Sequence, residues 1–75
     1  MTPERKRSLS IAGHRTSVSL EDEFWEALKE IAAGEGRSLA TLIAEIDTAR
    51  GNINLSAALR LHALAHYRKL AGARG

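Results

Sequence analysis

Polar and apolar residues alternate along the segment 15–20, which reads RTSVSL. Its polar side carries Arg15, Ser17 and Ser19, and its other side carries Thr16, Val18 and Leu20. Alternation with a period of two is typical of a strand that has one face on a core and the other in water. We therefore predict one short N-terminal strand with an apolar inner face.

The first 13 residues show no comparable periodicity. They are polar and basic, and we predict a flexible basic arm over residues 1–13, followed by the folded domain over residues 14–75. Leu9–Ile11 is a candidate for a second extended piece, and Gly13 predicts a bend or bulge between that piece and the strand.

Apolar residues at helical spacing predict two helices after the strand. The first begins at a cap on Ser19 or Glu21 and ends near Gly34 and Gly36, which suit the left-handed conformation that closes a helix. The second begins at a cap on Ser38. Their apolar stripes are Phe24, Trp25, Leu28, Ile31 and Ala32, then Leu39, Leu42, Ile43 and Ile46.

A third helix is expected after Gly51 and Asn52, which interrupt the second stripe. It begins at Asn54 or Ser56 and runs to about Leu70. Apolar residues occur on nearly all of its sides, and such a helix must be covered by something.

The length of 75 residues and the absence of cysteine restrict how this chain is stabilised. A short chain buries little surface, and without disulfides or thiolate metal sites the commonest support is a partner subunit. A single strand also needs another strand for its backbone hydrogen bonds. We therefore expect a mainly α fold with one short N-terminal β-strand and three helices, forming an intertwined homodimer through an intermolecular antiparallel two-stranded ribbon. The expected dimer core is Val18, Leu20, Phe24, Trp25, Leu28, Leu42, Ile43 and Ile46.

Charge is distributed unevenly, although the net charge is only +2. Four cations, Arg5, Lys6, Arg7 and Arg15, lie in the first fifteen residues, and acidic residues dominate segment 21–35. An anionic partner is therefore expected at the N-terminal segment. The acidic face of the first helix, with Glu23, Glu26 and Glu30, is either a solvated face that also keeps an anionic partner away or a docking surface for a basic partner.

The run HRTSVSLEDEFWEALKEIAAGEGRSLATLIAEID, from His14 to Asp47, resembles a ribbon-helix-helix domain of the MetJ/Arc-like type. The shared features are a polar strand, Leu20, an acidic helix start, the turn Gly36-Arg37-Ser38 and an apolar second helix. The chain is most similar to a bacterial subgroup with an extended N-terminus and an additional C-terminal helix. ARGNINLS interrupts the second helix, so the resemblance does not extend to the C-terminal third.

The resemblance implies a homodimer that binds double-stranded DNA and regulates transcription as a repressor, with the ribbon in the major groove. The base contacts it implies are Arg15, Ser17 and Ser19, and capping of the following helix is an equal alternative for Ser19. The phosphate contacts it implies are Arg37, Ser38, Leu39 and Thr41 at the second helix, with Arg5, Lys6 and Arg7 added by the arm.

No enzyme, cofactor or metal site is expected. The chain lacks a cysteine nucleophile and a glycine-rich phosphate loop, and no aspartate is placed to orient a histidine beside a serine. His62 and His66 are four apart, but two ligands make a poor metal site, and we expect core or interface histidines. His14 either contacts phosphate or closes the bend.

Two other functions stay open at this level. One is a protein-interaction module, such as the antitoxin-like partner of a toxin, that uses the apolar C-terminal helix. The other is a purely structural helical dimer. No apolar run is long enough to cross a membrane, and a cytoplasmic, nucleoid-associated protein with no membrane partner is expected.

Overall fold

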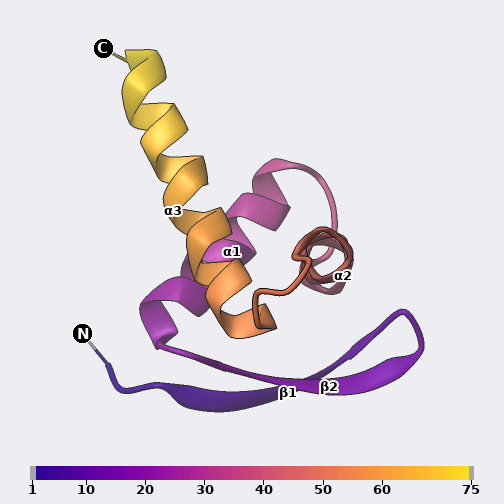
Figure 1. The fold of residues 1–75 in the computed structure, drawn as a ribbon. Coiled ribbons are helices and arrows are strands. Elements are labelled where there is room, and N and C mark those ends of the chain that lie inside the picture. Colours follow the sequence, from indigo (N-terminus) through magenta and orange to yellow (C-terminus); the bar gives the residue numbers. More distant parts are fainter. Residues whose placement is uncertain (1, 75) are drawn as a thin grey trace.

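The computed structural model describes residues 2–74 of the chain. Its elements, in order, are β1 (Arg5–Ile11), β2 (His14–Leu20), α1 (Asp22–Gly34), α2 (Leu39–Ala49) and α3 (Leu55–Arg74). The two strands lie along one side of the molecule and the three helices along the other, while the second half of α3 extends away from the body (Figure 1).

The strands β1 and β2 form an antiparallel hairpin within one chain. Ala12 and Gly13 connect them with positive φ angles of 50° and 83°, as a two-residue type I′ turn requires. The bend predicted at Gly13 is confirmed, as is the strand predicted over residues 15–20, which begins one residue earlier.

The N-terminal segment differs from the flexible arm predicted for residues 1–13, because residues 5–11 form strand β1. The expectation of a single N-terminal strand in each chain is therefore wrong. The inward positions of β1 include Arg5 and Arg7, and these cations conceal the alternation that Leu9 and Ile11 continue. Met1 and Gly75 lie outside the described residues.

The helix boundaries follow the predicted caps closely. After Gly34, Gly36 takes a left-handed conformation with φ of 69°, and the Arg37 amide donates to the Ala32 carbonyl. The Ser38 hydroxyl accepts from the Thr41 amide at the start of α2. The side chain of Asn54 accepts from the Ala57 amide at 2.8 Å, and α3 then continues beyond the predicted end at Leu70.

One core lies between the hairpin and the helices. Six of the eight residues predicted for a dimer core are buried in it within a single chain: Val18, Leu20, Leu28, Leu42, Ile43 and Ile46. Phe24 and Trp25 are only partly buried against it. The first half of α3 adds Leu59 and Ala63 to this core. Strand β1 and helix α3 therefore cover apolar side chains that were predicted to be covered by a second copy of the chain.

Candidate nucleic-acid interface

The outer face of the hairpin is polar along its whole length. The strand register pairs Lys6 with Ser19, Ser8 with Ser17 and Ser10 with Arg15, and these six residues alternate with the inward ones. Arg15 and Ser17 are exposed, and Ser19 is half-buried. The face predicted for Arg15, Ser17 and Ser19 is therefore present, and β1 adds Lys6, Ser8 and Ser10 to it.

Positive charge on this face is not neutralised by acidic residues. Over residues 2–74, neither Lys6 nor Arg15 takes part in an ion pair. The serines between them offer hydroxyl groups that both donate and accept hydrogen bonds. A two-stranded ribbon with this chemistry fits the major groove of DNA, where base edges present donors and acceptors.

Arg5 and Arg7 differ from Lys6 because they lie on the inner side of β1. The guanidinium of Arg7 forms an ion pair with Asp22 and lies over the ring of Trp25, 4.8 Å from its centroid. Arg5 approaches the same carboxylate at 3.4 Å. Both cations help to fix the hairpin to the start of α1, so of the three predicted arm contacts only Lys6 lies on the outer face.

Helix α3 covers part of the outer edge of β2. In a two-residue hairpin the closing pair, here Ile11 and His14, exchanges hydrogen bonds and every second pair does the same. Ser19 therefore directs its backbone groups away from β1. Its amide donates to the Ser56 hydroxyl at 3.0 Å, and its carbonyl accepts from Arg60 at 3.1 Å.

Arg60 connects three parts of the fold at this point. Its guanidinium also donates to Glu21 at 3.1 Å and to Glu4 at 2.7 Å. The pKa of Glu21 is lowered by hydrogen bonding to its own backbone and by the hydrogen bond from Arg60. The backbone of Ser19 is thereby held by α3, and Ser19 does not cap α1, whose cap position is Glu21.

The start of α2 is arranged differently from the predicted phosphate site. The Arg37 guanidinium donates to Glu35 at 2.8 Å and to Glu45 at 2.6 and 2.9 Å, and the bonds to Glu45 lower the pKa of that carboxyl. Two carboxylates thus neutralise the predicted cation. Ser38 and Thr41 are exposed and share a 2.8 Å hydrogen bond. The first amides of a helix have no acceptor within it, so a phosphate contact at Ser38, Leu39 and Thr41 stays a prediction.

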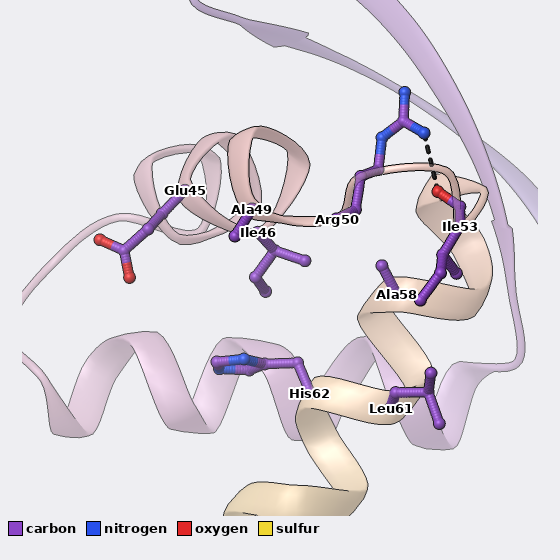
Figure 2. A pocket seen from close by; sticks show the side chains of 8 residues that line it. All are labelled: Glu45, Ile46, Ala49, Arg50, Ile53, Ala58, Leu61 and His62. Atoms are coloured by element: carbon purple, nitrogen blue, oxygen red, sulfur yellow. Dashed lines mark hydrogen bonds between the residues drawn. The ribbon is translucent and has the colours of Figure 1, made fainter.

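An open groove of about 400 Å³ lies between the end of α2 and α3. Figure 2 shows its eight lining residues, with Ile46 and Ala49 facing His62 and Leu61 across the opening. A second groove of about 350 Å³, almost wholly apolar, lies between α1 and α3 and is lined by Phe24, Ala27 and Leu64 among others. Leu61 borders both grooves.

The two histidines of α3 have different neighbours. His62 lines the first groove, and His66 packs edge-on against Tyr67 with ring centroids 5.1 Å apart. In the described part of the chain, three or more His, Cys, Asp or Glu side chains nowhere come together as metal ligands would. None of the helices described is both long enough and apolar enough to span a membrane.

Comparison with protein families places these features in a known group. The model of a ribbon-helix-helix domain matches residues 4–67. The chain belongs to the ribbon-helix-helix domain family. Members of this family typically bind DNA and form dimers. No curated protein and no solved structure matches this ribbon-helix-helix chain. The match includes β1 and most of α3, so it extends beyond the segment His14–Asp47 that carried the resemblance.

Sequence reasoning missed the contribution of β1 to this ribbon-helix-helix surface. Lys6 was assigned to a flexible arm, and Ser8 and Ser10 were not considered. The available signal was the alternation of Lys6, Ser8 and Ser10 with Arg7, Leu9 and Ile11. This alternation is recognised only if Arg7 counts as an inward residue. Arg7 can lie on the inner side because it contacts Asp22 and Trp25 there.

Proposed function

We propose that this chain is a sequence-specific DNA-binding regulator of transcription, a repressor rather than an enzyme, that inserts the outer face of its hairpin into the major groove. The observation that carries the proposal is the polar face with two cations, Lys6 and Arg15, that form no ion pair within residues 2–74. Family membership supports the same function.

Base contacts and phosphate contacts are assigned to different residues in this proposal. Arg15 makes a bidentate contact to guanine, and Ser17 and Ser19 contact other base edges. Lys6 contacts a phosphate or a base from the neighbouring strand. The Ser38 and Leu39 amides with the Thr41 hydroxyl hold a phosphate and fix the orientation of the ribbon. Arg5, Arg7 and Arg37 are already paired with carboxylates and contribute little to binding.

The regulator is proposed to act as a homodimer on a roughly palindromic site, because two-fold protein symmetry matches two-fold operator symmetry. Strand pairing between copies through the outer edge of β2 has Arg15 and Ser17 available. Ser19 becomes available only if Ser56 and Arg60 release it. As a DNA-binding protein the chain would work in the cytoplasm, on the nucleoid.

The proposal is tested by selecting bound sequences from a random pool of duplex DNA at two salt concentrations. Wild type is compared with Arg15→Ala and Ser17→Ala. Lys29→Ala is the matched control, since Lys29 is a cation on α1 that pairs with Glu26 away from the ribbon. Loss of one good base contact weakens discrimination by about 1–3 kcal/mol, or roughly 5- to 150-fold.

We expect wild type and Lys29→Ala to enrich the same palindrome, while the two ribbon variants lose it and keep salt-sensitive background binding. If Arg15→Ala enriches the same sequence with unchanged affinity, the outer face does not read DNA. If wild type enriches nothing at either salt concentration, sequence-specific binding is excluded.

A second candidate function is binding of another protein, such as a toxin to which this chain is the antitoxin. The exposed Leu61 and Leu64 on α3 favour it, since large apolar side chains on a surface often mark an interaction site. Co-expression with the product of a neighbouring small gene, followed by co-purification, tests this function. Loss of the complex in Leu61→Ser would support it.

A further inference from the structure

Helix α3 has an unpartnered seam on the side opposite the core. Ala57, Leu61, Leu64, Arg68 and Ala71 follow one another at alternating spacings of four and three residues. This is the spacing by which one helix packs along another. Leu61 and Leu64, in the middle of the seam, are 53% and 52% exposed. A second helix is what such a surface fits.

The second half of α3 leaves the body of the protein. Tyr67 still reaches Glu30 near the end of α1, at 2.9 Å, but Leu70 is 48% exposed and the helix continues to Arg74 beyond it (Figure 1). An isolated stretch of helix gains little stability from its own hydrogen bonds and depends on packing. The projecting part therefore needs contact with another surface.

The charges of α3 and α1 are opposite. Helix α3 contains no acidic residue, and its exposed Arg68 and Lys69 take part in no ion pair formed by residues 2–74. Helix α1 carries four acidic residues, Asp22, Glu23, Glu26 and Glu30. Asp22 is paired with Arg5 and Arg7, and Glu26 with Lys29, while Glu23 and Glu30 take part in no ion pair formed by residues 2–74. The surface beside the seam therefore attracts a cationic helix like α3 itself.

We propose that the α3 seam is an interface between two copies of this chain, in which the two α3 helices pack antiparallel with Leu61 of each against Leu64 of the other. Two copies can use the same surface. Each presents the exposed Leu61 and Leu64 for apolar contact and the cation Arg68 for contact with an acidic residue of the other copy. Each α3 lies over the apolar groove between α1 and α3 of the other copy, where Phe24 and Ala27 are exposed to it.

Charge selects the antiparallel orientation over the parallel one. Within one chain α1 and α3 run in the same direction, since Arg60 contacts Glu21 and Tyr67 contacts Glu30. A parallel pair would place Arg68 beside Arg68 of the other copy. An antiparallel pair instead places Arg68 beside Ala57 of the other copy, toward the end of the groove where Glu23 of its α1 lies, and its positive charge is attracted by that carboxylate.

The first experiment measures mass by sedimentation over a range of protein concentrations. We expect the double variant Leu61→Ser with Leu64→Ser to have half the mass of wild type. Its helical circular dichroism signal should fall by no more than the projecting turns of α3 after Tyr67, because both leucines are exposed and lie outside the core. The matched control is Ile53→Ser, which removes a similarly exposed apolar side chain, 46%, outside the seam. An unchanged mass in the double variant overturns the proposal.

The second experiment fixes the orientation by disulfide trapping, which is clean because the chain has no cysteine of its own. In the antiparallel pair position 57 faces position 68, so the two copies of position 57 are offset by 11 residues (68 − 57), or about 16 Å along the axis. That offset exceeds the reach of a disulfide. Ala57→Cys alone should stay unlinked, and Ala57→Cys with Arg68→Cys should form covalent dimers. Cross-linking of Ala57→Cys alone refutes the antiparallel seam.

Association through the seam and DNA binding by the hairpin depend on different residues, so one can be disproved without the other. Arg15→Ala should abolish the selected DNA sequence and leave the mass unchanged. The seam variant should keep the hairpin intact, so each separated unit still carries Lys6 and Arg15. If the seam variant retains its mass but loses the ability to hold a different, co-purified protein, the surface belongs to a foreign partner instead of a second copy.

Discussion

The two-residue turn of the hairpin provides the most direct test of the fold. Ala12 and Gly13 both have positive φ, and only the second is glycine. A side chain in the left-handed region costs roughly 1–2 kcal/mol, and asparagine tolerates the region better than alanine. Ala12→Asn should therefore raise the free energy of unfolding by about 0.5–1 kcal/mol.

Gly13→Ala should lower the free energy of unfolding. A Cβ at position 13 meets no atom within 4 Å, so no steric clash contributes and the backbone conformation alone sets the cost. The left-handed penalty of roughly 1–2 kcal/mol is partly offset by about 0.4–1 kcal/mol from the restricted unfolded chain, which leaves a loss of about 1 kcal/mol. For a domain of this size the melting temperature falls by about 4–8 °C.

The assay is thermal and urea unfolding followed by circular dichroism at one protein concentration, because association shifts apparent stability. Gly34→Ala is the control: a Cβ there also meets no atom within 4 Å, but Gly34 lies at the end of α1 without a positive φ, so alanine should stabilise. If residues 1–13 were an unpaired arm, Ala12→Asn and Gly13→Ala would both change stability by less than about 0.5 kcal/mol. That outcome would refute the intrachain hairpin.

Three further predictions follow from other parts of the structure. Leu59→Ala removes a fully buried side chain of α3 and should cost about 2–5 kcal/mol in urea unfolding, whereas a negligible loss would mean that α3 is not part of the core. Arg60→Gln should cost about 1–2 kcal/mol and should speed amide hydrogen exchange at Ser19; protection unchanged at Ser19 would contradict the edge contact. The lowered pKa values of Glu21 and Glu45 stabilise the fold above the ordinary glutamate value of 4.5, and this stability is lost as pH falls below it through the lowered values. In Glu21→Gln the free energy of unfolding should change less steeply with pH below 4.5 than in wild type. A slope equal to that of wild type would mean that protonation of Glu21 does not affect stability.

Local chemistry allowed much of the fold to be predicted. The strand at residues 15–20, the start of α2 at Ser38 and the start of α3 at Asn54 depend on alternation and on capping side chains that act within a few residues. The polar face with Arg15 and Ser17 follows from the same alternation. These features were predictable because the interactions that fix them join residues close together in the sequence.

Other features depend on contacts between distant residues. Strand β1 was missed because Arg7 faces inward, where Asp22 neutralises it and Trp25 stacks with it. Arg37 was assigned to phosphate, but Glu45, eight residues later, binds its guanidinium. In both cases the sequence showed a cation, and only the tertiary structure showed which cations were already paired.

The sequence by itself therefore determined the order of β2 and the three helices, the polar face of β2 and the resemblance to the family, since periodicity and capping are local properties. The tertiary structure decided that β1 pairs with β2 within one chain, that Lys6, Ser8 and Ser10 lie on the outer face of this hairpin, and that α3 covers the edge of β2 at Ser19. It decided these because strand register and charge pairing depend on which residues meet in space, and separation along the chain does not fix that.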